Sequence, residues 1–149
     1  MKISVNRLTE ADIPGMHHEI RNSLGHLKEL GWVERSLYLQ FRNHYRQIIK
    51  MEDLMVFVIR VDGEVAGAVE VEDKKDCWFI GYWIGVRFRR KGIVTQCIQD
   101  ILNHDIPHTK PLTARVAPDN VASIKILEKL GLSETHKDEE WVYYRKYLY

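Results

Sequence analysis

The sequence has few of the features that mark several classes of protein. Its two cysteines, Cys77 and Cys97, have no CxxC spacing and give no sign of a disulfide framework or a thiolate zinc site. The longest wholly apolar run, Leu54 to Ile59, is too short to span a bilayer. The N-terminus contains no apolar core of signal-peptide length. We therefore expect a cytoplasmic protein with no membrane partner.

Neither sign of charge is in excess, and the histidines form no metal-binding pattern. Lys and Arg number 22 and Asp and Glu 21, a formal net charge of +1, which argues against a general nucleic-acid coat. His17 and His18 are adjacent and would diverge on a helix, and Pro107 breaks the face shared by His104 and His108. We expect neither a metal site nor a nucleic-acid partner.

The hydrophobic pattern begins with one strand and two helical regions. Lys2 to Arg7 alternates apolar and polar residues, as a strand does. Thr9 begins a helical region that runs to about Leu30, with an interruption near Gly25 and an end at Gly31. A second helix is indicated by apolar residues at spacings of four and three, which we expect to face the core: Leu37, Phe41, Tyr45 and Ile48.

The rest of the chain alternates between strands and helices. Leu54 to Val61 and Glu64 to Val71 flank Asp62-Gly63, a strong signal for a two-residue hairpin, and a third strand follows at Cys77 to Val86. The remaining elements are a helix from Gly92, a strand at Leu112 to Val116, a helix with Ala122, Ile124, Leu127 and Leu130 near one face, and strands at residues 132–136 and 140–148. This order predicts one mixed α/β domain over residues 1–149.

The stretch from Gly81 to Leu102 carries the clearest functional signal. It begins as a strand and passes through a basic turn, Arg87 to Lys91, into an amphipathic helix that starts near Gly92. Such a turn presents unpaired N–H groups and the positive end of a helix dipole, which together bind phosphate. At Gly92 we expect the backbone to approach a ligand too closely for a Cβ. The pattern predicts a site for a phosphorylated ligand; a solubilising turn, or a contact to RNA or DNA, is the alternative.

Two motifs stand out in the second half of the chain: Arg89-x-x-Gly92 with Ile93-Val94-Thr95, and Asn120-Val-Ala-Ser123 followed by Leu127-Glu-Lys-Leu-Gly131-Leu132. The first resembles the R/Q-x-x-G-x-G/A motif of the GCN5-related N-acetyltransferases (GNAT), and the second resembles the next element of that family. Ile80-Gly-Tyr-Trp-Ile84 and Arg21-Asn-Ser-Leu-Gly-His26-Leu look most like the branch of the ribosomal-protein N-terminal acetyltransferases (RimL and RimJ). The resemblance implies a mixed, mostly antiparallel central sheet with helices on both faces and a strand splay that forms a coenzyme A groove.

The resemblance also implies a reaction and its binding residues. The acetyl group of acetyl-CoA, the co-substrate, would pass to a primary amine, either a protein N-terminus or a small molecule, in a monomer or homodimer. Trp83 and Ile84 would contact the pantetheine arm through their backbones, and Asn120 would contact the pantetheine region. The aromatic side chains of Trp78, Tyr82 and Trp83 are expected to form core and groove wall. The diphosphate would be held mostly by N–H groups of Arg89, Arg90, Lys91, Gly92, Ile93, Val94 and Thr95.

The catalytic residues depart from the pattern common in the family. Leu127 stands where many relatives carry a tyrosine that protonates the leaving thiolate, and Ser123 matches the serine given that duty in the ribosomal branch. Phe79 stands where relatives often have a glutamate. Glu70 and Glu72 share one face of the strand before the binding strand, and Glu70 is our candidate general base. The alternatives are a solvated pair of carboxylates, a serine that only packs, and a module that binds acyl-CoA without transferring anything.

Overall fold

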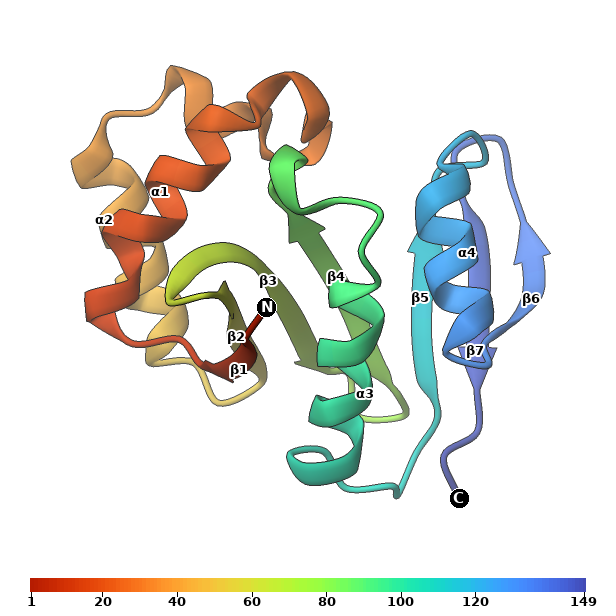
Figure 1. Cartoon of the computed structure of the whole chain (residues 1–149). Coiled ribbons are helices and arrows are strands. Elements are labelled where there is room, and N and C mark those ends of the chain that lie inside the picture. Colours follow the sequence, from red (N-terminus) through yellow and green to blue (C-terminus); the bar gives the residue numbers. More distant parts are fainter.

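A computed structural model describes the backbone of residues 1–149 and the side chains of all residues except 28 and 29. One seven-stranded sheet has the strand order β1-β2-β3-β4-β5-β7-β6 (Figure 1). Its strands are β1 (Ile3–Arg7), β2 (Leu54–Val61), β3 (Glu64–Asp73), β4 (Trp78–Ile84), β5 (Leu112–Val116), β6 (Ser133–Lys137) and β7 (Val142–Lys146). Every neighbouring pair is antiparallel except β4 and β5, which are parallel. The expected mixed, mostly antiparallel sheet is confirmed.

Four α-helices cover the two faces of this sheet. They are α1 (Ile13–Asn22), α2 (Tyr38–Ile49), α3 (Ile93–His104) and α4 (Val121–Lys129), with short 3-10 segments at Glu10–Asp12, Leu24–His26, Lys28–Arg35 and Val86–Phe88. The buried residues of α1 and α2 pack with Val56, Val58 and Ala68 in one core, whereas those of α3 and α4 pack in a second core with alternate residues of the same strands. Helices α1 and α2 therefore cover one face of the sheet, and α3 and α4 cover the other.

Helix α3 forms because its apolar residues fall on one side. That stripe is buried at every position: Ile93, Val94, Cys97, Ile98, Ile101 and Leu102. Burial of each large apolar side chain stabilises the fold by about 1.5–3 kcal/mol, so this stripe fixes α3 on the sheet. The same burial raises the pKa of the Cys97 thiol to about 12, which makes Cys97 a core residue and not a nucleophile.

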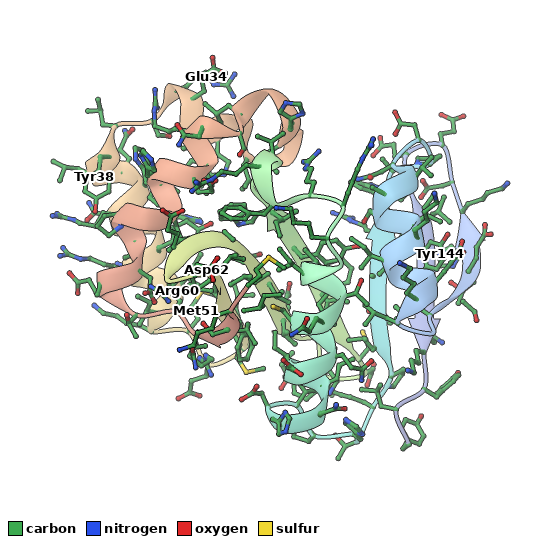
Figure 2. All side chains as sticks on the ribbon, in the orientation of Figure 1. Glu34, Tyr38, Met51, Arg60, Asp62 and Tyr144 are labelled. Carbon is green, nitrogen blue, oxygen red and sulfur yellow. The ribbon has the colours of Figure 1, made fainter. Side chains whose placement is uncertain are left out.

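The predicted hairpin between β2 and β3 is confirmed. Asp62 and Gly63 both have positive φ, at 50° and 86°, as a two-residue hairpin turn with the twist of its strands requires. The amide of Asp62 also donates to the carbonyl of Lys2 over 2.8 Å, which joins the end of β2 to the start of the chain. Figure 2 labels Asp62 and Arg60 in this part of the molecule.

The first helical region differs from its prediction. It does not end at Gly31, because a 3-10 segment continues to Arg35 across a kink at Leu30. Leu37 was expected on the core stripe of the second helix but is 72% exposed. Its backbone is extended because it precedes the first turn of α2, and only Phe41, Tyr45 and Ile48 of that stripe are buried. At the same end of α2, Tyr38 points outward (Figure 2).

Two further findings concern the described part of the chain. None of its helices has both the length and the apolar character needed to cross a membrane. No group of three or more His, Cys, Asp or Glu side chains among the described residues is placed to hold a metal ion.

Candidate active site

The sheet opens between β4 and β5. The two strands pair only at Trp78 with Leu112 and at Phe79 with Thr113, although β4 continues to Ile84. At this junction the amide of Trp78 donates to the carbonyl of Pro111 over 2.8 Å, and the Thr113 hydroxyl donates to the carbonyl of Trp78 over 3.0 Å. Beyond it the ribbons diverge (Figure 1). Main-chain groups on the facing edges are therefore not used by the sheet.

The direction of the peptide groups in β4 decides which residues face this gap. In a strand, the N–H and C=O of one residue point to the same edge, and those of the next residue point to the opposite edge. The N–H of Trp78 points toward β5, so its C=O does as well. Those of Tyr82 and Ile84 therefore do the same. The carbonyl of Trp83 lies against β3 instead, since a Cβ on Gly67 would come within 2.3 Å of it. Of the two residues expected to offer backbone groups in the gap, Ile84 turns these groups toward the gap and Trp83 turns them toward β3. Those of Tyr82 face the gap.

The turn before α3 has the backbone expected of an anion site. Gly92 is the N-cap of α3 in a left-handed conformation, with φ of 71°, and Arg90 also has positive φ, 64°. The first four amides of a helix, here those of Gly92 to Thr95, have no acceptor within the helix. No side chain caps them either. A Cβ on Gly92 would meet no protein atom within 4 Å, and the positive φ is itself a reason for glycine here.

The basic side chains of this turn have different surroundings. Arg87 is paired with Glu19 at 3.0 Å and with Glu64 at 2.9 Å. The guanidinium of Arg89 donates to the carbonyl of His26 over 2.8 Å. Arg90 and Lys91 are exposed, and no ion pair or hydrogen bond joins them to any of the described side chains. Positive charge is thus available at residues 90 and 91, next to the uncapped helix.

Helix α4 contacts β4 across the gap. Asn120 is its N-cap and accepts a hydrogen bond from the amide of Ser123 over 3.2 Å. The Ser123 Oγ lies 2.5 Å from the hydroxyl oxygen of Tyr82, on the α3 and α4 face of the sheet. Leu127, further along α4, is fully buried in the core and carries no polar atom. The structure brings Ser123 and Asn120 together and adds Tyr82 to them.

Glu70 lies on the opposite face of the sheet. It shares that face with Ala68, in the core of α1 and α2, and is paired across the strands with Gly81. A Cβ on Gly81 would meet nothing within 4 Å, so the space over this position is open. Burial, and then the charge of Glu72, raise the pKa of Glu70. A carboxyl with a raised pKa therefore sits on β3, opposite a residue of β4 that has no side chain.

This arrangement can be compared with known proteins. A family model described as an acetyltransferase (GNAT) domain matches residues 2–133. The chain belongs to this family. It is a GNAT N-acetyltransferase, and GNAT enzymes use acetyl-CoA.

Relatives of known sequence or structure agree with this family. The chain is 28% identical over 159 residues to the uncharacterized N-acetyltransferase YjdG of Bacillus subtilis, and the match covers 94% of this chain and 95% of YjdG. A RimL ribosomal-protein α-N-acetyltransferase, solved with coenzyme A, superimposes with a TM-score of 0.86 at 17% identity, covering 99% of this chain and 94% of RimL. A chimera of the spermidine N-acetyltransferase SpeG from Vibrio cholerae and hSSAT superimposes with a TM-score of 0.80 at 15% identity, covering 99% of this chain and 96% of the chimera. At such identities the two structures support the GNAT fold.

Some residues around this GNAT site are not signalled by the sequence. Glu19 and Ser23 are both 1% exposed, and each contacts the chain at the start of the basic turn: Glu19 through Arg87, and Ser23 through the amide of Val86 at 3.0 Å. In the sequence, the sign of this contact was the carboxylate of Glu19 on the apolar side of α1. Tyr82 was expected only to form core and groove wall. Its contact with Ser123 spans 41 positions of the chain, so no local pattern signals it.

Proposed function

We propose that the chain transfers the acetyl group of acetyl-CoA to a primary amine by direct attack, with residues 1–149 acting as one acetyltransferase domain. The observation that carries the proposal is the parting of β4 from β5 shortly before the uncapped start of α3. Unused strand edges offer hydrogen bonds to an extended arm, and a helix N-terminus binds phosphate. The pantetheine arm and the diphosphate of coenzyme A need these two kinds of partner.

The binding residues follow from this division. Main-chain groups of Tyr82 and Ile84 serve the pantetheine arm in the gap, and Asn120 at the start of α4 adds a polar side chain. The side chains of Arg90 and Lys91 add positive charge beside the amides. The complete set for the diphosphate is Arg89, Arg90, Lys91, Gly92, Ile93, Val94 and Thr95.

Two residues on opposite faces of the sheet are proposed for the proton transfers. An amine at pH 7 is mostly ammonium and must lose a proton before it attacks the thioester. Glu70, whose pKa is raised by burial and by Glu72, takes this proton directly or through water. Ser123 lies on the other face, where it donates to the sulfur that leaves. Direct attack requires no covalent bond to the protein, so no nucleophilic cysteine is needed.

The acceptor is either a protein N-terminal amine or a small amine. RimL is named for the first kind of acceptor and SpeG for the second, and both resemble this chain in fold. The open space opposite Glu70 is the proposed place for the reacting amine. Nucleic acid is not proposed as a partner, because the formal net charge is only +1 and the charge of Arg87 is matched by Glu19 and Glu64. The assembly is a monomer or a homodimer.

A module that binds acyl-CoA without transfer is the second candidate. It is favoured by the full burial of Leu127 and by Phe79, whose ring is covered by the ammonium of Lys74 at 4.4 Å. Two measurements separate the candidates: calorimetric titration with coenzyme A, and thiol release from acetyl-CoA over a panel of amines and N-terminal peptides. Saturable binding with acceptor-dependent thiol release supports the transferase. Binding without release on any acceptor supports the module, and no binding at millimolar coenzyme A removes both.

A further inference from the structure

The contact between Tyr82 and Ser123 is not needed to place either residue. The amide of Ser123 is already satisfied by Asn120, and Tyr82 is held by the pairing of β4 with β3. Even so, the two hydroxyl oxygens lie 2.5 Å apart, at the short end of the range for O–H···O hydrogen bonds. They meet where β4 and β5 no longer pair, on the face that α3 and α4 cover.

Each hydroxyl has one hydrogen, so the direction of this bond matters. If Ser123 donated to Tyr82, the Ser123 hydrogen would not be available to a ligand, and the Tyr82 hydroxyl would donate to the carbonyl of Ser123 over 3.3 Å. If Tyr82 donates to the Ser123 Oγ, the hydrogen of Ser123 is free to turn elsewhere. A phenol is a much stronger acid than an aliphatic alcohol and hence the better donor. The short contact to Oγ is therefore the one that Tyr82 makes as donor.

Tyr82 holds its own hydrogen over the whole physiological range. It is partly buried between β4 and α4, and this burial raises its pKa to about 12, against a smaller opposing effect of the hydrogen bond with Ser123. A phenol in this state is neutral at any working pH and remains a donor. Leu127 offers no hydroxyl in this core, so Tyr82 is the phenol that reaches α4 here.

We propose that Tyr82 is a positioning residue for the leaving group: it donates to the oxygen of Ser123 and so directs the Ser123 hydrogen toward the thioester sulfur. This inference rests on the proposed transferase function. As the bond from carbon to the amine nitrogen forms, the bond from carbon to sulfur breaks and its electron pair goes to sulfur. Ser123 stabilises this thiolate and gives it a proton, which Tyr82 and then water replace. The amine loses one proton and the sulfur gains one, so no other reactant is required.

The test is a double-mutant cycle on thiol release with the best acceptor of the panel. Tyr82→Phe and Ser123→Ala are each expected to lower kcat by about tenfold or more, at an unchanged dissociation constant for coenzyme A. Because the two hydroxyls act in one relay, the double variant should be no slower than the slower single variant. Tyr144→Phe is the control, since it removes a buried phenol from β7 (Figure 2) and should leave kcat unchanged.

Other outcomes overturn the inference. An unchanged kcat in Tyr82→Phe, or effects that multiply in the double variant, would mean that Tyr82 does not act through Ser123. A fall in coenzyme affinity or in Tm that accounts for the lost rate would make Tyr82 a packing residue. Wild-type protein that binds coenzyme A without any transfer would remove the proposed function, and this inference with it. An active wild type with an unaffected Tyr82→Phe variant would remove the inference alone.

Discussion

Glu19 on α1 accepts a hydrogen bond from Arg87 over 3.0 Å, Oε1 to Nε, although 68 positions of the chain separate them. The Glu19 side chain is 2% exposed and that of Arg87 is 52% exposed, so a buried carboxylate depends on a cation at the surface. Gly85 makes this approach possible, because a Cβ there would come within 2.6 Å of the Glu19 carboxylate. Helix α1 therefore holds the chain that leads into the diphosphate turn.

Loss of Arg87 should destabilise the protein more than loss of Glu19. Arg87→Met leaves the Glu19 carboxylate buried without its cation, at a cost of about 2 kcal/mol, below the range for fully buried pairs because half of Arg87 is in water. Glu19→Gln removes the buried charge itself and should cost less. Urea unfolding of both variants measures the two free energies. Equal losses would mean that the pair matters only as a hydrogen bond.

Glu64 provides the matched control for this pair. It contacts the same guanidinium at 2.9 Å, but its side chain is 62% exposed, so Glu64→Gln should change the free energy of unfolding by under about 1 kcal/mol. Coenzyme A affinity gives a second comparison. Arg87→Met should weaken it, because the preceding chain loses its anchor on α1, whereas Glu64→Gln should leave it unchanged.

Gly92 should be required for coenzyme binding because of its backbone. A side chain at its φ of 71° costs about 1–2 kcal/mol, and relief of that strain would turn the first amides of α3 away from the diphosphate. Gly92→Val should therefore weaken coenzyme A binding while the fold is retained. Gly63→Ala is the control, since Gly63 has φ of 86° in the β2–β3 hairpin and its variant should lose stability without losing coenzyme affinity. Unchanged affinity in Gly92→Val would contradict the assigned turn.

The parts of the fold predicted correctly are those encoded by neighbouring residues. The bounds of β2 and the buried stripe of α3 follow from hydrophobic period, and the hairpin follows from Asp62-Gly63. The 3-10 segment that continues to Arg35 was not predicted, because a helix signal does not distinguish this short, kinked form from an α-helix. Leu37 was misplaced because a residue just before a helix can fit the helical spacing of apolar residues in the sequence, although its extended backbone does not place it on the buried face of the helix.

The candidate site could be predicted only in part for a similar reason. The turn at Gly92 and the start of α4 at Asn120 are local, and the motifs that contain them were recognised in the sequence. The contacts of Tyr82 with Ser123 and of Glu19 with Arg87 join distant segments, and no local pattern records them. The choice between Trp83 and Tyr82 depends on which edge of β4 faces β5, which requires the pairing of the strands.

Glu70 should control the dependence of the rate on pH. Because its pKa is raised, Glu70 stays protonated to higher pH than an ordinary glutamate, and kcat/KM should fall as pH falls through that raised value. Glu70→Gln should lower kcat by about 10²–10⁴-fold and abolish this acid limb. Glu72→Gln removes one cause of the raised pKa, so its acid limb should move to lower pH with little change on the plateau. A limb unaffected by either variant would belong to another group.

The same shift predicts an effect on stability. A carboxyl with a raised pKa in the folded chain binds its proton more tightly there than in the unfolded chain. It therefore favours folding at low pH, and this contribution is lost as pH rises through the folded value. Glu70→Gln should accordingly be more stable than wild type at neutral pH, and the difference should shrink toward pH 4. Thermal melts across this range measure it, and a variant less stable at pH 7 would contradict the sign.

The open space over Gly81 should belong to the acceptor and not to the coenzyme. A Cβ at this position meets no atom within 4 Å, and valine is favoured in strands, so Gly81→Val should fold normally. Its two methyl groups would occupy the space opposite Glu70, so KM for the amine should rise at an unchanged dissociation constant for coenzyme A. Gly67→Ala is the contrast in the adjacent strand: its Cβ would meet the carbonyl of Trp83 at 2.3 Å, and the loss should be in stability, by about 1–3 kcal/mol. If Gly81→Val weakened coenzyme A binding and left KM for the amine unchanged, the acceptor would have to approach from the face that carries α3 and α4.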